Sequence, residues 1–184
     1  MAIITPVTLV GPEVTLVPLT RAHGDALWAA QDADTWRWTI DHPRTRAEFE
    51  EVVMDRALAG MAEGRELCWL TTDTGSGAVY GSTRFLNPSE RDRRVEIGWT
   101  WLGPAARGTG VNRAAKALQL AHAFGPADCV RVELKTDARN LRSQRAMEKL
   151  GATREGVFRR YQLTQGGVFR DTVWYAILKD EWRG

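Results

Sequence analysis

A glycine-rich segment, Arg107-Gly108-Thr109-Gly110-Val111-Asn112, is the part of this sequence best suited to binding a ligand. It follows a strand-like run, residues 95–102, and opens a helix-like run, residues 112–124. Glycine lets the backbone turn tightly, and the first amides of a helix lack partners within it, so a helix N-terminus attracts anions. The segment therefore predicts a site at which backbone N–H groups bind phosphate.

Two other phosphate-binding motifs fit this segment poorly. A P-loop has a lysine after its second glycine, where this sequence has Thr109. The dinucleotide-binding fingerprint has a third glycine where this sequence has Arg113, and it belongs to the first strand and helix of its fold. The sequence gives little support to a nucleoside triphosphatase or to a Rossmann-type enzyme.

The segment fits a third motif, Arg/Gln-x-x-Gly-x-Gly/Ala, and departs from it only at Asn112. In this motif and in a second block, residues 137–152, the chain resembles the GNAT superfamily of N-acetyltransferases. Its C-terminal half is most similar to the ribosomal-protein N-terminal acetyltransferases of the RimJ/RimL-like branch. The resemblance implies that acetyl-CoA binds the glycine-rich segment, with Asn140 on the pantetheine arm and Ser143 close by. The cofactor-binding residues implied are Arg107, Gly108, Thr109, Gly110, Val111, Asn112, Asn140 and Ser143.

Glu96 and Ser143 are the first candidates for proton transfer. Glu96 projects from the strand beside the expected thioester, and we interpret it as the general base, with a solvated strand glutamate as the alternative. Glu133 is a weaker second candidate base. The family often has a tyrosine seven residues after its asparagine, but Met147 stands there in this chain. Ser143 is left as the group that relays a proton to the CoA thiolate, with helix capping as its other role and Tyr161 as a substitute.

A sheet must hold these residues, and the chain has the elements for one. Strands are expected over residues 14–19, 66–72, 78–86, 95–102, 129–136 and on both sides of Gly166-Gly167, and helices after Thr20, Thr45, residue 111 and Asn140. The strand, helix and strand within residues 95–136 predict a parallel pair, whereas the hairpins beside them predict antiparallel pairing.

The expected fold class is α/β (α+β), a single domain over residues 1–184 with a mixed, mostly antiparallel central sheet flanked by helices. Its cofactor-binding core is expected over residues 94–160. The family resemblance implies the GNAT (acyl-CoA N-acyltransferase) fold, in which two middle parallel strands splay apart.

Alternation along the fourth of these strands indicates an open cleft. A buried parallel strand is usually apolar on both faces, so a polar face on such a strand indicates that no other element covers that face. Backbone N–H groups near Trp99 to Trp101 are candidates for binding the oxyanion. The expected apolar face is Val95, Ile97, Trp99 and Trp101, and the expected polar face is Glu96, Gly98 and Thr100.

Composition narrows the other function classes. With 184 residues, 43% of them hydrophobic, the chain fits one domain with a real core, and its net charge of +2 is too small to indicate nucleic-acid binding. Cys68 and Cys129 lie in apolar runs and predict buried free thiols. We expect a cytoplasmic protein with no metal, no nucleic acid and no membrane partner, and a homodimer is compatible with the sequence.

The resemblance and the residues together lead to an acetyl-CoA-dependent N-acetyltransferase in which the amine attacks the thioester directly. Branch resemblance favours the N-terminal amine of a protein or peptide as the acceptor. A small amine, an amino sugar or an antibiotic are alternatives within the same reaction class. A non-catalytic acyl-CoA sensor, suggested by Met147, and a pure interaction domain are alternatives from other classes.

Overall fold

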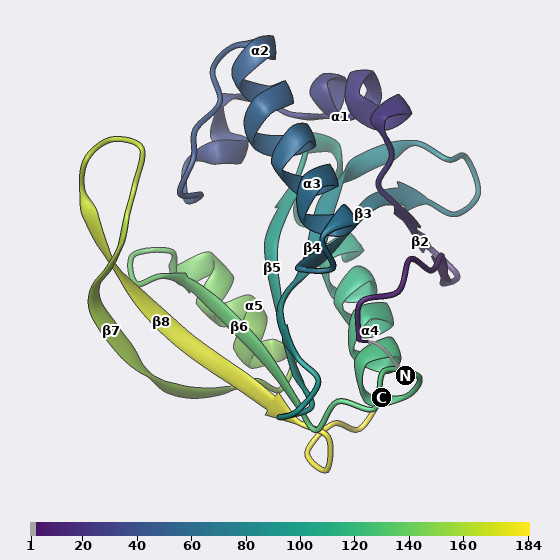
Figure 1. The fold of residues 1–184 in the computed structure, drawn as a ribbon, viewed down its shortest axis with the longest axis vertical. Coiled ribbons are helices and arrows are strands. Elements are labelled where there is room, and N and C mark those ends of the chain that lie inside the picture. Colours follow the sequence, from purple (N-terminus) through teal and green to yellow (C-terminus); the bar gives the residue numbers. More distant parts are fainter. Residues whose placement is uncertain (1–2) are drawn as a thin grey trace.

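The molecule is built on one mixed sheet that has helices packed against both faces (Figure 1). A computed structural model describes residues 3–184. The strands are β1 (Leu9–Val10), β2 (Val14–Pro18), β3 (Glu66–Asp73), β4 (Val79–Ser89), β5 (Arg94–Leu102), β6 (Arg131–Asp137), β7 (Thr153–Leu163) and β8 (Phe169–Leu178). The α-helices are α1 (Gly24–Ala30), α2 (Arg46–Phe49), α3 (Arg56–Ala62), α4 (Val111–Phe124) and α5 (Leu141–Lys149). Shorter helical segments are η1 (Arg21–His23), η2 (Ala33–Trp36), the π-helix η3 (Glu50–Asp55) and η4 (Pro104–Ala106).

The strand order is β1-β2-β3-β4-β5-β6-β8-β7, and every neighbouring pair is antiparallel except β5 and β6. The predicted mixed, mostly antiparallel sheet with one parallel pair is therefore confirmed. The ladder between β5 and β6 ends at the pair Glu96 and Glu133, although both strands continue beyond it. The two strands thus part in the middle of the sheet, directly after Glu96.

Two apolar clusters hold the helices to the sheet. The larger packs α4 against one face, through residues such as Leu120 on the helix and Ile97 on β5. The smaller packs α1, α2 and α3 against the opposite face, where Phe49 contacts Trp36 edge-on. Cys68 and Cys129 are both buried and free, as their apolar surroundings in the sequence predicted.

The predicted helix after Thr45 forms, but its middle is a π-helix rather than an α-helix. The hydroxyl of Thr45 accepts the backbone N–H of Glu48 and caps the run, which continues through α2, η3 and α3. The wider turn of η3 places Met54 in the core, a position that the regular helical spacing did not mark. The predicted loop after β4 also begins later than expected, because the strand extends to Ser89.

The predicted alternation along β5 is wrong in the second half of the strand. Trp99 has a left-handed backbone with φ of 47°, and the register of β5 against β4 shifts there. One extra residue in a strand reverses the side chains that follow it. Trp99 therefore lies on the same face as Glu96, with the guanidinium of Arg84 4.7 Å from its ring, and Trp101 joins the cluster of α1–α3. Thr100 instead faces α4.

The hairpin of β7 and β8 reaches the segment that precedes α2. The backbone N–H of Gln165 at its tip donates to the carbonyl of Ile40 (2.9 Å), and Arg170 donates to the carbonyl of Trp38 (3.1 Å). Figure 1 shows the long hairpin at the left of the view, rising beside that segment. The loop between η2 and α2 is thus hydrogen-bonded to the hairpin of β7 and β8.

The side chain of Lys116 is buried between α4 and the sheet. Its Nζ donates to the hydroxyls of Thr83 on β4 (3.0 Å) and Thr100 on β5, and more weakly to Gln119 (3.3 Å). No carboxylate within residues 3–184 forms an ion pair with it, and burial lowers its pKa to about 7. The amine thus connects α4, which begins at the glycine-rich segment, to Thr100 on β5, the residue after the bulge.

We expect Lys116→Met to stabilise the protein near neutral pH. In the unfolded chain the amine has a pKa of 10.5, so between about pH 7 and 10.5 the unfolded state holds the extra proton and wild-type stability rises with pH. Below pH 7 the full cost of burying the charge is present, on the order of a few kcal/mol. Urea unfolding at pH 6, 7.5 and 9 should show this rise in the wild type and a smaller one in the variant, where the half-buried histidines His23 and His122, whose pKa values are lowered by burial, still contribute. A wild-type stability that does not rise over this range would show that Lys116 stays charged at no cost.

Candidate active site

The glycine-rich segment forms the turn that leads into α4. Gly108 and Gly110 have φ of 78° and 97°, a region that favours glycine, and a Cβ added at either would meet no atom within 4 Å. The Thr109 hydroxyl donates to the carbonyl of Ala106 (2.8 Å) and steadies the turn. Within residues 3–184, no backbone N–H from Gly108 to Arg113 donates a hydrogen bond to the protein. This segment can therefore offer its amides to an anion, as the diphosphate of acetyl-CoA requires.

The side chains of this segment lie in different surroundings. Val111 is buried in the core cluster, so only its backbone can serve a ligand. The half-buried side chain of Asn112 makes no hydrogen bond within the described chain and stays available. The guanidinium of Arg107 turns to η2 instead, where it donates to both carboxylate oxygens of Asp32 (2.6 and 3.0 Å) and to Thr35 (2.7 Å). Arg107 thus anchors the segment.

The ion pair between Arg107 and Asp32 lowers the pKa of Asp32 to about 2, chiefly through the hydrogen bond from the arginine. Asp32→Asn should raise the KM for acetyl-CoA about two- to fivefold and leave kcat unchanged. The effect is modest because the Asp32 side chain is 37% exposed, and exposed ion pairs contribute about 1 kcal/mol or less. Initial rates at varied acetyl-CoA measure it. An unchanged KM would mean that the segment keeps its shape without this anchor.

Asn140 and Ser143 meet at the start of α5. The Asn140 Oδ1 atom accepts the backbone N–H of Ser143 (3.1 Å) and caps the helix. The Asn140 Nδ2 atom and the Ser143 hydroxyl make no hydrogen bond with any of residues 3–184, so both remain available to a ligand. Met147, one turn further along α5, packs against the core rather than offering a proton.

Glu96 lies at the point where β5 and β6 part. Its carboxylate is 1% exposed, and Oε2 accepts hydrogen bonds from Lys135 on β6 (2.9 Å) and from Asn87 on β4 (2.9 Å). The other oxygen, Oε1, accepts none from the described residues. Such a carboxylate is held in one orientation by the hydrogen bonds to Oε2. It can still accept a proton on Oε1, which has no hydrogen-bond partner among the described residues. Neither Lys135 nor Asn87 stood out in the sequence, because both partners come from other strands.

Gly98 leaves room for that carboxylate. A Cβ at this position would lie 2.9 Å from Glu96 Oε1 and 2.8 Å from Leu86 Cδ1, closer than side-chain carbons approach such atoms. The weaker candidate base, Glu133, is held by Arg131 (2.9 Å) and Arg94 (3.4 Å), one arginine on each of its oxygens. The contacts favour Glu96 over Glu133 as the group able to take a proton.

An aromatic cluster covers the other side of Lys135. The Lys135 Nζ lies 5.0 Å from the ring centroid of Trp174 on β8 and 5.9 Å from that of Tyr161 on β7. Tyr161 also contacts Phe158 edge-on, and its side chain is exposed. Tyr161 thus lies near the ion pair of Glu96 and Lys135 rather than in the core.

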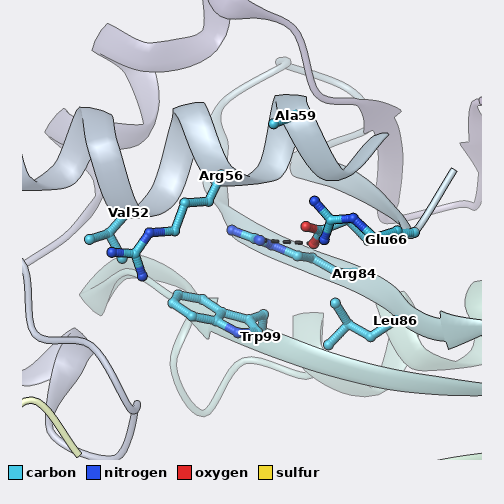
Figure 2. Close-up of a pocket in the computed structure, with 8 residues that line it drawn as sticks. Val52, Arg56, Ala59, Glu66, Arg84, Leu86 and Trp99 are labelled. Carbon is cyan, nitrogen blue, oxygen red and sulfur yellow. Dashed lines mark hydrogen bonds and ion pairs between the residues drawn. The ribbon is translucent and has the colours of Figure 1, made fainter. Parts of the chain in front are cut away.

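A pocket of about 420 Å³ opens between α3 and the sheet (Figure 2). Leu86 lines it and is the strand partner of Glu96. The floor of the pocket is the ion pair of Arg84 with Glu66 (2.9 Å), and Trp99 forms one wall. Arg56 and Arg65 also line it. A second pocket of about 360 Å³ shares Arg65, Glu66 and Leu86 with the first and extends to Asn87. Sequence reasoning missed these arginines because they are distant from one another along the chain and fit no motif.

Within residues 3–184, no helix is long and apolar enough to cross a membrane. The same residues contain no cluster of three or more His, Cys, Asp or Glu side chains that could hold a metal ion.

Comparison with known proteins places this arrangement among acetyltransferases. Residues 13–153 match the family described as "Acetyltransferase (GNAT) domain". A Bacillus subtilis protein, "Putative ribosomal N-acetyltransferase YdaF", is 30% identical over 152 residues, which are 83% of this chain and 74% of that protein.

Two solved structures are also similar to this chain. A GCN5-related N-acetyltransferase from Brucella melitensis has a TM-score of 0.88 at 30% identity, covering 97% of this chain and 81% of that one. RimJ of Mycobacterium smegmatis, solved in complex with CoA-disulfide, has a TM-score of 0.83 at 24% identity, covering 97% and 90%.

Proposed function

Because the chain belongs to the acetyltransferase (GNAT) family and is an N-acetyltransferase, we propose that it acetylates the N-terminal amine of a protein or peptide. The family implies acetyl-CoA as the acetyl donor. The similarity to YdaF supports the acceptor class, because that protein carries the name "Putative ribosomal N-acetyltransferase". The observation that carries the proposal is the position of Glu96, which has one open oxygen at the point where β5 and β6 part.

The free amides from Gly108 to Arg113 would hold the diphosphate of acetyl-CoA, and Asn140 Nδ2 would donate to its pantetheine arm. Acetyl-CoA supplies the activated acetyl group. The acetyl group would then reach the gap between the strands, because α4 begins at the amides and packs on β5.

Glu96 would accept, directly or through water, the proton that the acceptor amine loses before or as its nitrogen bonds to the acetyl carbon. An α-amine, with a pKa of about 8, is neutral in roughly a tenth of molecules at pH 7, whereas a lysine amine near 10.4 is far more costly to deprotonate. The Ser143 hydroxyl would relay a proton to the leaving sulfur, taking one from water as it gives one up. The backbone N–H groups around the bulge at Trp99 remain our candidates for the developing oxyanion.

CoA release measured against a panel of peptides and small amines tests the proposal. We expect the highest kcat/KM with peptides that have a free N-terminus, and none with the same peptides blocked at that amine. Preference for a small amine or an amino sugar would overturn the acceptor class. Binding of acetyl-CoA without turnover, unaffected by Glu96→Gln, would indicate a sensor. A melting temperature that CoA does not raise would indicate an interaction domain.

A further inference from the structure

We propose that the pocket beside Glu96 binds an acidic side chain of the acceptor, so that this enzyme favours peptides with carboxylates close to the N-terminal amine. We call it the arginine pocket; Arg56, Arg65, Arg84, Glu66, Leu86 and Trp99 line it. The inference rests on the proposed function, because it assumes that a peptide enters this face of the sheet.

The arginine pocket borders the proposed base. Leu86 in its wall pairs with Glu96 across β4 and β5, and both side chains approach the same point above Gly98. The adjoining second pocket extends to Asn87, which donates to the Glu96 carboxylate. An amine placed at Glu96 would therefore have its next residues within reach of the pocket, because an extended chain advances about 3.4 Å per residue.

The lining of the pocket carries an excess of positive charge. Three arginines face one glutamate, and that glutamate, Glu66, is already paired with the buried Arg84. Arg84 also donates to the carbonyl of Val53 in the π-helix η3, so its position is fixed from two sides. Among residues 3–184, Arg56 and Arg65 form ion pairs only with carboxylates that do not line the pocket, at Asp41, Glu51 and Glu63.

Both of these arginines can bind a further carboxylate. Arg65 uses only its Nε, with Glu63 as partner, and its two Nη groups donate to none of residues 3–184. Arg56 contacts Asp41 at 3.4 Å and Glu51 at 3.3 Å, long for charge-assisted hydrogen bonds, which are usually 2.7–2.9 Å. Their side chains are 62% and 54% exposed, and ion pairs so exposed are weak.

The remaining lining suits a short acidic side chain better than a free anion. Trp99 and Leu86 offer apolar surface to the methylene groups, while the arginine forks match a carboxylate in two-pronged geometry. Figure 2 shows Arg56 extending from its helix toward Trp99, with the pair of Arg84 and Glu66 beneath the helix. A lysine on the acceptor would meet like charge there and bind poorly.

The test compares three peptides that share their first residue and length and differ in the next two: Asp-Glu, Asn-Gln or Lys-Lys. For wild type we expect a KM at least tenfold lower for the acidic peptide than for the neutral one, and the basic peptide should be poorest. Arg56→Gln combined with Arg65→Gln should raise the KM of the acidic peptide about tenfold or more. The KM for acetyl-CoA and that for the neutral peptide should stay unchanged.

Arg21→Gln is the matched control. Arg21 lies before α1, is 61% exposed and pairs with two carboxylates, Glu50 and Asp55, but it does not line the arginine pocket. This variant should keep the wild-type preference, whereas Arg65→Glu should shift the preference toward the Lys-Lys peptide. Equal KM values for the acidic and neutral peptides in wild type would overturn the inference and leave the proposed function standing. Failure to acetylate any of the peptides would overturn both.

Discussion

Glu96→Gln should lower kcat for peptide acetylation by at least about 100-fold at pH 7, because a positioned general base typically contributes 10²–10⁴-fold. Glutamine has nearly the same shape and can still accept a hydrogen bond from Lys135 through its amide oxygen, but it cannot take up a proton. The deficit should narrow by up to about tenfold as the pH rises past about 8, since solvent then removes the ammonium proton that Glu96 would remove at pH 7. Steady-state kinetics from pH 6.5 to 9 measure both features.

Glu133→Gln is the control for this prediction. Glu133 is buried on the neighbouring strand and forms ion pairs of its own. It is paired with Glu96 in the last residue pair of the parallel ladder between β5 and β6. Its substitution should change kcat only slightly. Equal losses in the two variants, or a Glu96→Gln deficit that stays constant with pH, would mean that Glu96 supports structure rather than proton transfer.

Gly110→Val should weaken CoA binding by roughly 5- to 150-fold. Gly110 caps α4 with φ of 97°, and holding another residue in such a region costs about 1–3 kcal/mol. The free protein can relieve that strain by letting the turn move, and binding then has to restore the geometry that presents the amides. Isothermal titration with CoA gives the change in Kd directly.

Gly151→Val provides the comparison, because Gly151 has φ of 94°, follows α5 and also has no atom within 4 Å of its would-be Cβ. The Gly151→Val variant has the same backbone strain at a position far along the chain from the glycine-rich segment. The free energy of unfolding of this variant should fall, but its Kd for CoA should match that of wild type. If both glycine variants bind CoA like wild type, the shape of the turn is not what binds the nucleotide.

Most of the fold could be predicted from local signals. The βαβ unit around residues 95–136 and the hairpins beside it gave the mixed sheet, because strand periodicity and turn residues are written in neighbouring positions. The bulge at Trp99 could not be predicted, because a tryptophan is not a residue that favours positive φ, and the ring packs on Arg84, which comes from another strand. The alternation of β5 was therefore wrong beyond that point.

In the candidate site, too, some features follow from neighbouring residues and others depend on contacts between distant segments. The free amides of the glycine-rich segment follow from glycines that lie next to one another in sequence, and the position of Glu96 follows from the strand that carries it. The roles of Lys135, Asn87 and Asp32 depend on contacts between elements that are far apart in sequence. No single-sequence pattern specifies such pairs.

A crystal structure of the protein with bound CoA tests the central claim most directly. Diphosphate oxygens should lie within about 2.7–3.2 Å of backbone nitrogens between Gly108 and Arg113, with the thiol end in the gap beside Glu96. A diphosphate bound elsewhere, with these amides facing only water, would contradict the claim.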